Sequence, residues 1–215
     1  MELQETKTGE YTIFIPSMNE TYHSRNGAIS ESKHVFIKEG MNRVTFDTKI
    51  LEIGFGTGLN AMLTGLEALK QLRHVEYHTL EPFPIPSSLI DQLKYGEILK
   101  DKNLFNEIHD AEWEQAVDIS VYFSLHKTTQ KLEYIQLKDN NYDVIYFDAF
   151  APKKQEELWT PKIYKKLYDS LKTDGVLSTY SAAGQLKRDL KSVGFRIENP
   201  PGANGKREMT VAMKA

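Results

Sequence analysis

Residues 52–60 place an acidic side chain beside three alternating glycines. Glu52 stands two positions before Gly54, and Gly56 and Gly58 follow. Between a strand and a helix, such glycines let backbone N–H and carbonyl groups approach a ligand closely. The dinucleotide fingerprint G-x-G-x-x-G requires glycine at position 59, where this chain has leucine. The pattern therefore indicates a nucleotide-like ligand other than NAD.

The acid beside the glycines favours a positively charged ligand. A sulfonium and an α-amino group need carboxylate and carbonyl oxygens nearby, whereas a pyrophosphate needs only donors. S-adenosylmethionine fits this requirement better than NAD. The residues predicted to bind it here are Glu52, Gly54, Gly56, Thr57, Gly58 and Asn60.

A second acid follows the next expected strand, about 20 residues beyond the glycine turn. Glu81 occupies the place where folds of this kind use an acidic side chain to accept both ribose hydroxyls. A single glutamate at a strand end is also compatible with a solvated terminus. The glycine turn makes the ribose role the better interpretation.

A third acid, Asp148, directly follows the apolar run of residues 142–147. The carboxyl ends of strands in an open parallel sheet line its ligand crevice, so we expect Asp148 to point at the reactive end of the ligand. There a carboxylate can accept a proton from an amine and orient its lone pair for in-line methyl transfer. Phe150 is placed to stack on a base. The alternative is an aspartate that only caps its loop.

Strands and helices alternate along the rest of the chain and position these residues. Helical spacing predicts helices over residues 59–72, 88–99, 161–172 and 185–193, with a Thr160 cap before Pro161. Seven strands are expected, over residues 49–53, 75–80, 119–125, 142–147, 176–180, 195–198 and 208–213. This order predicts an α/β fold: a mostly parallel seven-stranded sheet covered on both faces, with a terminal antiparallel hairpin. Residues 1–45 form an expected accessory segment, and residues 46–215 an expected Rossmann-like domain.

Composition limits the function classes further. The 215 residues are 40% hydrophobic and contain no cysteine, which excludes disulfides, thiolate nucleophiles and Cys-ligated metals. No apolar run approaches the roughly 20 residues that span a bilayer, and no signal peptide is recognisable, so we expect a cytoplasmic protein without membrane contact. With 27 basic and 30 acidic side chains, the net charge is −3, so any contact with RNA must come from a local basic patch.

Five separated blocks resemble one family, the tRNA 5-aminomethyluridine methyltransferases, which form the methyltransferase half of the bifunctional MnmC proteins and also occur as stand-alone enzymes. The blocks are residues 31–36, 52–60, 148–159, 180–184 and 206–209. The resemblance implies a class I S-adenosylmethionine-dependent methyltransferase fold and conversion of 5-aminomethyluridine, or its 2-thio form, to 5-methylaminomethyluridine at the tRNA wobble position. It assigns the catalytic role to Asp148. No FAD-binding oxidase half follows, so only the methylation step is implied.

Two departures from the family pattern concern the site. Gln155 and Glu156 replace a common Asn-Pro, from which we expect only a loop adjustment. Before an expected helix over residues 129–137, the family often has Gly-Asp-Ala to contact the adenine, and this chain has Leu125, His126 and Lys127. We therefore expect His126 or backbone groups to replace the missing carboxylate.

Basic residues near the expected site are candidates for contacts with tRNA phosphates. They are Lys153, Lys154, Lys187, Arg188, Lys206 and Arg207. The histidines show no metal-ligand spacing, so no metal is expected, and nothing indicates an obligate protein partner.

Two alternatives stay open. An aminopropyltransferase resembling spermidine synthase shares the glycine turn, the ribose acid and the aspartate after the fourth strand, but its Gly-Gly-Gly-x-Gly turn is absent. The other is a non-catalytic tRNA-binding module with a methyltransferase fold, against which the presence of both Glu52 and Asp148 argues.

Overall fold

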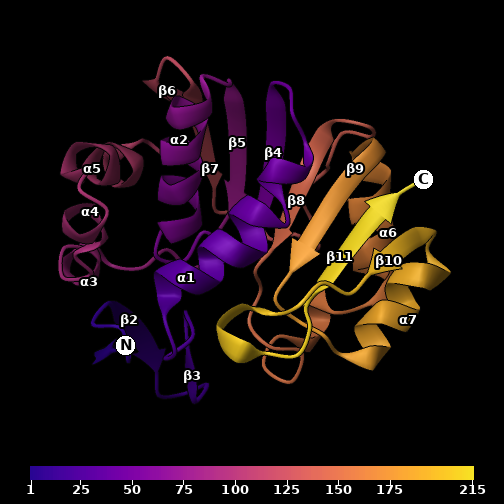
Figure 1. Cartoon of the computed structure of the whole chain (residues 1–215), viewed down its shortest axis with the longest axis horizontal. Helices are drawn as coiled ribbons and strands as arrows, with labels where there is room; N and C mark the ends of the chain where they lie inside the picture. Colours follow the sequence, from indigo (N-terminus) through magenta and orange to yellow (C-terminus); the bar gives the residue numbers. More distant parts are fainter.

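The computed structural model describes all residues 1–215, which form a large sheet and a small one (Figure 1). The large sheet has the order β10-β11-β9-β8-β4-β5-β7-β6. Strands β7, β5, β4, β8 and β9 are parallel, whereas β6, β11 and β10 are each antiparallel to a neighbour. The strands are β4 (Thr48–Ile53), β5 (Val75–Leu80), β6 (Ala116–Ser120), β7 (Phe123–Thr128), β8 (Tyr142–Phe147), β9 (Leu171–Thr179), β10 (Phe195–Glu198) and β11 (Thr210–Lys214).

Helices cover both faces of this sheet because its central strands are apolar on both sides. Within β8, Val144 and Tyr146 belong to one hydrophobic cluster, and Ile145 and Phe147 belong to the other. The first cluster packs against α1 (Ala28–Ser32), the π-helix η1 (Lys33–Lys38), α2 (Leu59–Gln71) and α5 (Lys102–Asp110), and the second against α6 (Pro161–Ser170) and α7 (Gly184–Ser192). This arrangement confirms the expected class I methyltransferase fold.

The small sheet and several short helices complete the chain. The small sheet is antiparallel and comprises β1 (Glu2–Glu5), β2 (Tyr11–Ile15) and β3 (Glu20–Thr21). The short helices are α3 (Ser87–Ile90), α4 (Tyr95–Ile98), η2 (Met41–Arg43), η3 (Glu156–Leu158) and η4 (Ala203–Gly205). Residues of α1, η1 and η2 join the main hydrophobic cluster, and so does Ile13 of β2, so the small sheet packs on the same core as the large one (Figure 1). A domain boundary at residue 45 stays a prediction.

The large sheet has eight strands rather than seven because the expected strand over residues 119–125 is a hairpin. Its turn lies at Val121 and Tyr122, and the Val121 side chain is exposed. Apolar and polar residues alternate on both sides of this turn, so the alternation alone does not mark it. The resulting β6 pairs antiparallel with β7 at the edge of the sheet.

Other differences from the expected elements have local causes. The expected helix over residues 88–99 is divided into α3 and α4, with Lys94 in the left-handed region at φ 57°. The expected helix over residues 129–137 is absent, and Lys166 of α6 donates hydrogen bonds to the carbonyls of Leu132, Glu133 and Ile135. Strand β9 begins at Leu171 instead of residue 176, with a register irregularity opposite Tyr142 and Val144.

Candidate active site

The glycine turn joins the end of β4 to the start of α2, as the sequence indicates. Gly54, Gly56 and Gly58 all have positive φ values, of 95°, 49° and 72°. A Cβ at Gly54 would lie 2.8 Å from the carbonyl oxygen of Asp148, so the ends of β4 and β8 approach each other here. A Cβ at Gly56 would lie 2.8 Å from the Tyr22 ring. Both close approaches depend on glycine.

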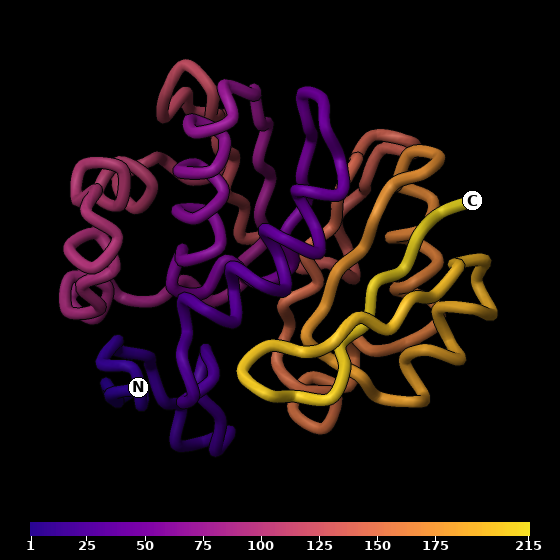
Figure 2. Tube along the Cα trace, in the orientation of Figure 1, coloured from indigo at the N-terminus to yellow at the C-terminus, as the bar shows by residue number.

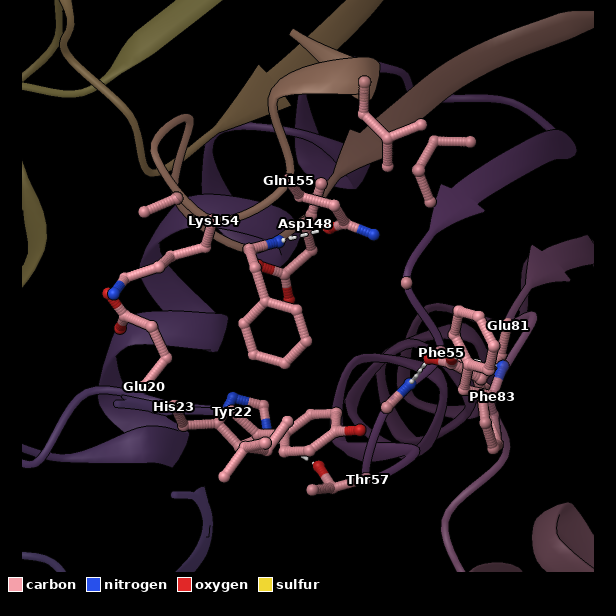
Figure 3. Close-up of a pocket in the computed structure, with 18 of the residues that line it drawn as sticks. Glu20, Tyr22, His23, Phe55, Thr57, Glu81, Phe83, Asp148, Lys154 and Gln155 are labelled. Carbon is pink, nitrogen blue, oxygen red and sulfur yellow. Dashed lines mark hydrogen bonds between the residues drawn. The ribbon is translucent and has the colours of Figure 1, made fainter. Parts of the chain in front are cut away.

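A cavity of about 610 Å³ lies beside this turn (Figure 3). Its walls come from the turn itself, from the residues after β5 and β8, and from the N-terminal segment around β3 and α1. The sequence-predicted residues that line it are Gly54, Gly56, Thr57, Glu81, Asp148, Phe150, Lys154 and Lys206. Residues that are distant in the sequence thus meet at the carboxyl ends of the parallel strands.

Asp148 is half-buried at the end of β8 and is held by an amide from α2. The Asn60 Nδ2 atom donates to Asp148 Oδ2 at 2.8 Å and to Glu52 Oε1 at 3.0 Å. Thr79 Oγ1 donates to the other oxygen of Glu52 at 2.6 Å. Glu52 is fully buried beneath the turn and does not line the cavity. One amide therefore connects the two carboxylates, and only Asp148 faces the cavity.

Burial makes both carboxyl groups harder to ionise. Burial raises the pKa of Glu52 to about 7, although the hydrogen bonds from Thr79 and Asn60 lower this pKa in part. Removal from water also raises the pKa of Asp148 well above its usual value, and the charge of Glu52 adds to this increase. The Asn60 hydrogen bond and the positive charge of Lys206 lower the pKa of Asp148 in part. A carboxylate with a raised pKa is a stronger base for an amine proton once it is ionised.

Glu81 enters the cavity from the end of β5. Its Oε2 atom accepts the Gly56 N–H at 3.0 Å, and its Oε1 atom accepts the Phe83 N–H at 3.1 Å. These backbone donors orient the carboxylate, while burial raises its pKa. Each oxygen retains acceptor capacity for a further hydroxyl group.

The N-terminal segment supplies contacts that the sequence analysis did not assign. The Tyr22 ring meets Phe150 edge to face at 5.0 Å between centroids, and His23 Nε2 lies 2.5 Å from Thr57 Oγ1. Burial lowers the pKa of His23 to about 4, so its ring is neutral near pH 7. Tyr22 and His23 thus hold this segment against the glycine turn (Figure 3). The sequence around Tyr22 and His23 carries no motif that indicates this role.

Besides Glu52, Gly58 and Asn60, which lie in or beside the turn, five predicted residues do not line the cavity: His126, Lys153, Lys187, Arg188 and Arg207. His126 points from the middle of β7 toward His78, with stacked rings 4.7 Å apart, and does not reach the cavity. Lys187 is paired with Glu208 at 3.1 Å, and Arg188 donates to Gln185. Arg207 is also absent from the cavity lining.

The segment after β7 reaches the cavity through Lys131, Leu132 and Glu133. Glu133 therefore places a carboxylic acid in the part of the cavity that follows β7, where His126 was expected to contact the adenine. The sequence analysis missed it because these residues were assigned to a helix. An acidic side chain shortly after a strand end is the signal that could have found it.

The charged side chains that line the cavity are mostly acidic. Three lysines, Lys131, Lys154 and Lys206, face six carboxylic acids: Glu20, Glu31, Glu81, Glu133, Asp148 and Glu157. Such a lining favours ligands that carry positive charge. The structure contains no group of three or more His, Asp or Glu side chains arranged to hold a metal ion.

The pattern of residues 91–215, more than half of the chain, matches a family described as S-adenosyl-L-methionine-dependent methyltransferases. The chain belongs to this family. The methyltransferase therefore uses S-adenosylmethionine as its methyl donor, as the glycine turn predicts. The cavity fits this donor in chemistry, because the acidic lining suits a sulfonium and Glu81 is placed for hydroxyl groups.

Named relatives agree with the resemblance drawn from the five blocks. A Marinomonas protein named tRNA 5-methylaminomethyl-2-thiouridine biosynthesis bifunctional protein MnmC is 30% identical over 90% of this chain and 31% of its own length. A Cupriavidus metallidurans protein of the same name is 27% identical over 94% of this chain and 32% of its own length. The methyltransferase thus spans about a third of the length of these relatives.

A solved structure matches the fold over nearly the whole chain. The crystal structure of MNMC2 from Aquifex aeolicus superimposes with a TM-score of 0.73 and 24% identity, covering 98% of this chain and 69% of the other. The match includes the N-terminal segment as well as the large sheet. No helix of the methyltransferase is both long enough and apolar enough to cross a lipid bilayer.

Proposed function

We propose that the methyltransferase transfers a methyl group from S-adenosylmethionine to the amine nitrogen of 5-aminomethyluridine, or of its 2-thio form, at the tRNA wobble position. The observation that carries this proposal is the Asp148 carboxylate in an acidic cavity at the end of β8. The names of the MnmC relatives support the choice of substrate. We place the reaction in the cytoplasm, with tRNA as the macromolecular partner.

Asp148 solves the main chemical difficulty of this substrate. An alkylamine is mostly protonated near pH 7, and an ammonium has no lone pair with which to attack a methyl carbon. Asp148 attracts the ammonium, accepts its proton directly or through one water, and orients the freed lone pair. Asn60 fixes the carboxylate for this task through its 2.8 Å hydrogen bond.

The residues at the turn are the proposed ligands of the donor, whose sulfonium supplies the methyl group. Glu81 is placed to accept the ribose hydroxyls, and the backbone of Gly54, Gly56 and Gly58 leaves room for close approach. Glu52 contributes negative charge from beneath the turn without contacting the ligand itself.

Contacts with tRNA are proposed for the side of the cavity that contains Phe150 and Lys154. Phe150 presents a ring next to Asp148 on which a nucleobase can stack, and Lys154 provides a charge for a phosphate. Lys153 and Arg207 are exposed and are the sequence neighbours of the lining residues Lys154 and Lys206. Lys187 and Arg188 are weaker candidates because each already binds a side chain of this protein.

The test is methyl transfer to an anticodon stem-loop RNA that carries 5-aminomethyluridine at its wobble position. With labelled S-adenosylmethionine, we expect one methyl group on that nucleoside by mass spectrometry and none on a stem-loop with uridine there. Aminopropyl transfer from decarboxylated S-adenosylmethionine to an added diamine, without methyl transfer to the RNA, would instead identify an aminopropyltransferase. RNA binding without transfer from either donor would identify a non-catalytic module.

In cells, removal of the protein provides an independent test. We expect tRNA from such cells to accumulate 5-aminomethyluridine or its 2-thio form. An unchanged nucleoside profile would contradict the proposed substrate.

A further inference from the structure

A lysine of the protein itself projects its ammonium into the cavity. Lys206 precedes β11 and forms an ion pair with Glu31 of α1. The Lys206 Nζ atom also lies 5.8 Å from the centroid of the Tyr180 ring. Glu31, Tyr180 and Lys206 line the same cavity as Asp148. A carboxylate and an aromatic face together form a favourable environment for an alkylammonium ion.

Glu31 depends on this cation. Its side chain is only 13% exposed, and Lys206 is its sole side-chain hydrogen-bond partner. A largely buried carboxylate without a partner is costly, so a cation that replaces Lys206 must bind at the same oxygens. The Lys206 side chain is 43% exposed and can therefore turn toward solvent when it is displaced.

The loop that carries Lys206 does not need this ion pair to keep its position. Asn204 donates to the Gly27 carbonyl at 3.1 Å and accepts from Ser30 at 2.9 Å. His34 Nε2 lies 2.7 Å from the Pro201 carbonyl oxygen. Figure 2 shows the yellow loop before β11 reaching the N-terminal part of the chain. The ammonium can therefore leave Glu31 while the loop remains in place.

The subsite lies next to the proposed base. The Tyr180 hydroxyl donates to the Ala149 carbonyl at 2.9 Å, which ties the ring to the residue after Asp148. Glu31 raises and Lys206 lowers the pKa of Asp148, so both charges act on that carboxyl group. A ligand ammonium bound at Glu31 would be adjacent to the group that must accept its proton.

We propose that Glu31 and Tyr180 form a binding subsite for a primary alkylammonium, and that Lys206 occupies it in the free protein in place of the substrate amine. This inference rests on the proposed function and adds the residues that recognise the amine. Substrate binding then exchanges one ammonium for another, and Lys206 becomes available to solvent or to a nearby RNA phosphate.

The test compares the binding of two stem-loop RNAs that differ only at the wobble position, where one has 5-aminomethyluridine and the other has uridine. Both are measured with S-adenosylhomocysteine present, and the ratio of their dissociation constants gives the preference for the amine. Contacts with phosphates affect both RNAs equally and cancel in this ratio. Lys206→Gln removes the competing ammonium and should raise the preference about three- to tenfold.

Glu31→Gln should lower the preference severalfold, to the part that Asp148 supplies, and the double variant Glu31→Gln/Lys206→Gln should resemble Glu31→Gln, because the gain from Lys206→Gln acts through Glu31. Lys49→Gln is the matched control: it breaks an ion pair with Glu76 on the large sheet, outside the cavity, and should leave the ratio unchanged. A ratio that is unchanged or lower in Lys206→Gln would overturn the proposal, as would one that Glu31→Gln does not alter.

Failure of the proposed function gives a different result. In that case the wild-type protein transfers no methyl group to the stem-loop with 5-aminomethyluridine. If only the ammonium subsite is wrong, wild-type transfer is intact and the two variants leave the preference for the amine unaltered.

Discussion

The cavity has two sides that are built by different means. On one side, the glycine turn and the ends of β4, β5 and β8 are fixed by backbone hydrogen bonds of the parallel sheet. On the other side, the segment from Glu20 to Phe36 and the loop before β11 meet through side chains, such as Ser30 with Asn204 and Lys206 with Glu31. The shape of the first side depends on backbone hydrogen bonds within the sheet. The contacts of the second side depend on side chains, so single substitutions can change them while the sheet stays intact. Donor binding and substrate recognition should therefore be separable by mutation.

Asp148→Asn is expected to give the largest effect because the proposed base sits where the two sides meet. The amide keeps the shape but cannot accept the amine proton, so methyl transfer should fall about 10²-fold or more. Affinity for the donor should change much less. Raising the pH should partly restore the rate, since more substrate then arrives deprotonated. Single-turnover rates across a pH series measure this, and a near-wild-type rate at neutral pH would remove Asp148 from the mechanism.

Gly56→Val tests the contact between the two sides. Valine is strained at φ 49°, and its Cβ would lie 2.8 Å from Tyr22. We expect loss of donor binding by calorimetry, about tenfold or more, in a protein that remains folded by circular dichroism. The double variant Gly56→Ala/Tyr22→Ala relieves the contact and should bind better than Gly56→Ala. Equal donor affinity for wild type and Gly56→Val would place the donor elsewhere.

Asn60→Ala tests whether the hydrogen bond from Asn60 controls the ionisation of Asp148. The amide stabilises the ionised forms of Glu52 and Asp148, so its loss raises the pKa of both. Because Asp148 must be ionised to act as a base, the acid limb of the pH–rate profile should move to higher pH. The rate at neutral pH should fall about tenfold. Asn42→Ala, which removes only an exposed amide, is the control. An unshifted acid limb would mean that Asn60 does not govern Asp148.

Lys154→Gln is expected to have the smallest effect. If Lys154 contacts one phosphate, the variant should bind tRNA severalfold more weakly, and the slope of log affinity against log salt should fall by about one. Lys187→Gln should change the binding less, because Lys187 is already paired with Glu208 outside the cavity. The reverse order of the two variants would show that tRNA approaches along α7 instead.

The two sides also differ in how far the sequence predicted them. Glu52 lies within a strand, and the three glycines and Asp148 follow strands. The apolar runs of these strands are local, so a short window of sequence was enough to place these residues. The confirmed fold class rests on the same local signals. The hairpin of β6 and β7 was missed because apolar and polar residues alternate on both sides of its turn. One strand was therefore predicted where the structure has two.

The pairings on the substrate side could not be predicted from the sequence because they join distant residues. Glu31 and Lys206 are 175 residues apart, and Asn204 and Gly27 are 177 apart. No local pattern pairs such residues. Lys187, Lys154 and Lys206 look alike as lysines in the sequence, and only the folded chain shows that the first is paired outside the cavity while the other two line it.

The position of β11 has a consequence for the order of folding. This strand follows β10 in the chain but lies between β10 and β9 in the sheet. Strand β10 therefore cannot join the sheet until β11 has inserted, and the loop with Asn204 and Lys206 reaches α1 only when that insertion occurs. Such distant pairings form slowly because loop closure precedes any gain from contacts. The donor side needs only β4, β5 and β8 in place, whereas the proposed amine subsite also needs β11, the last strand of the chain.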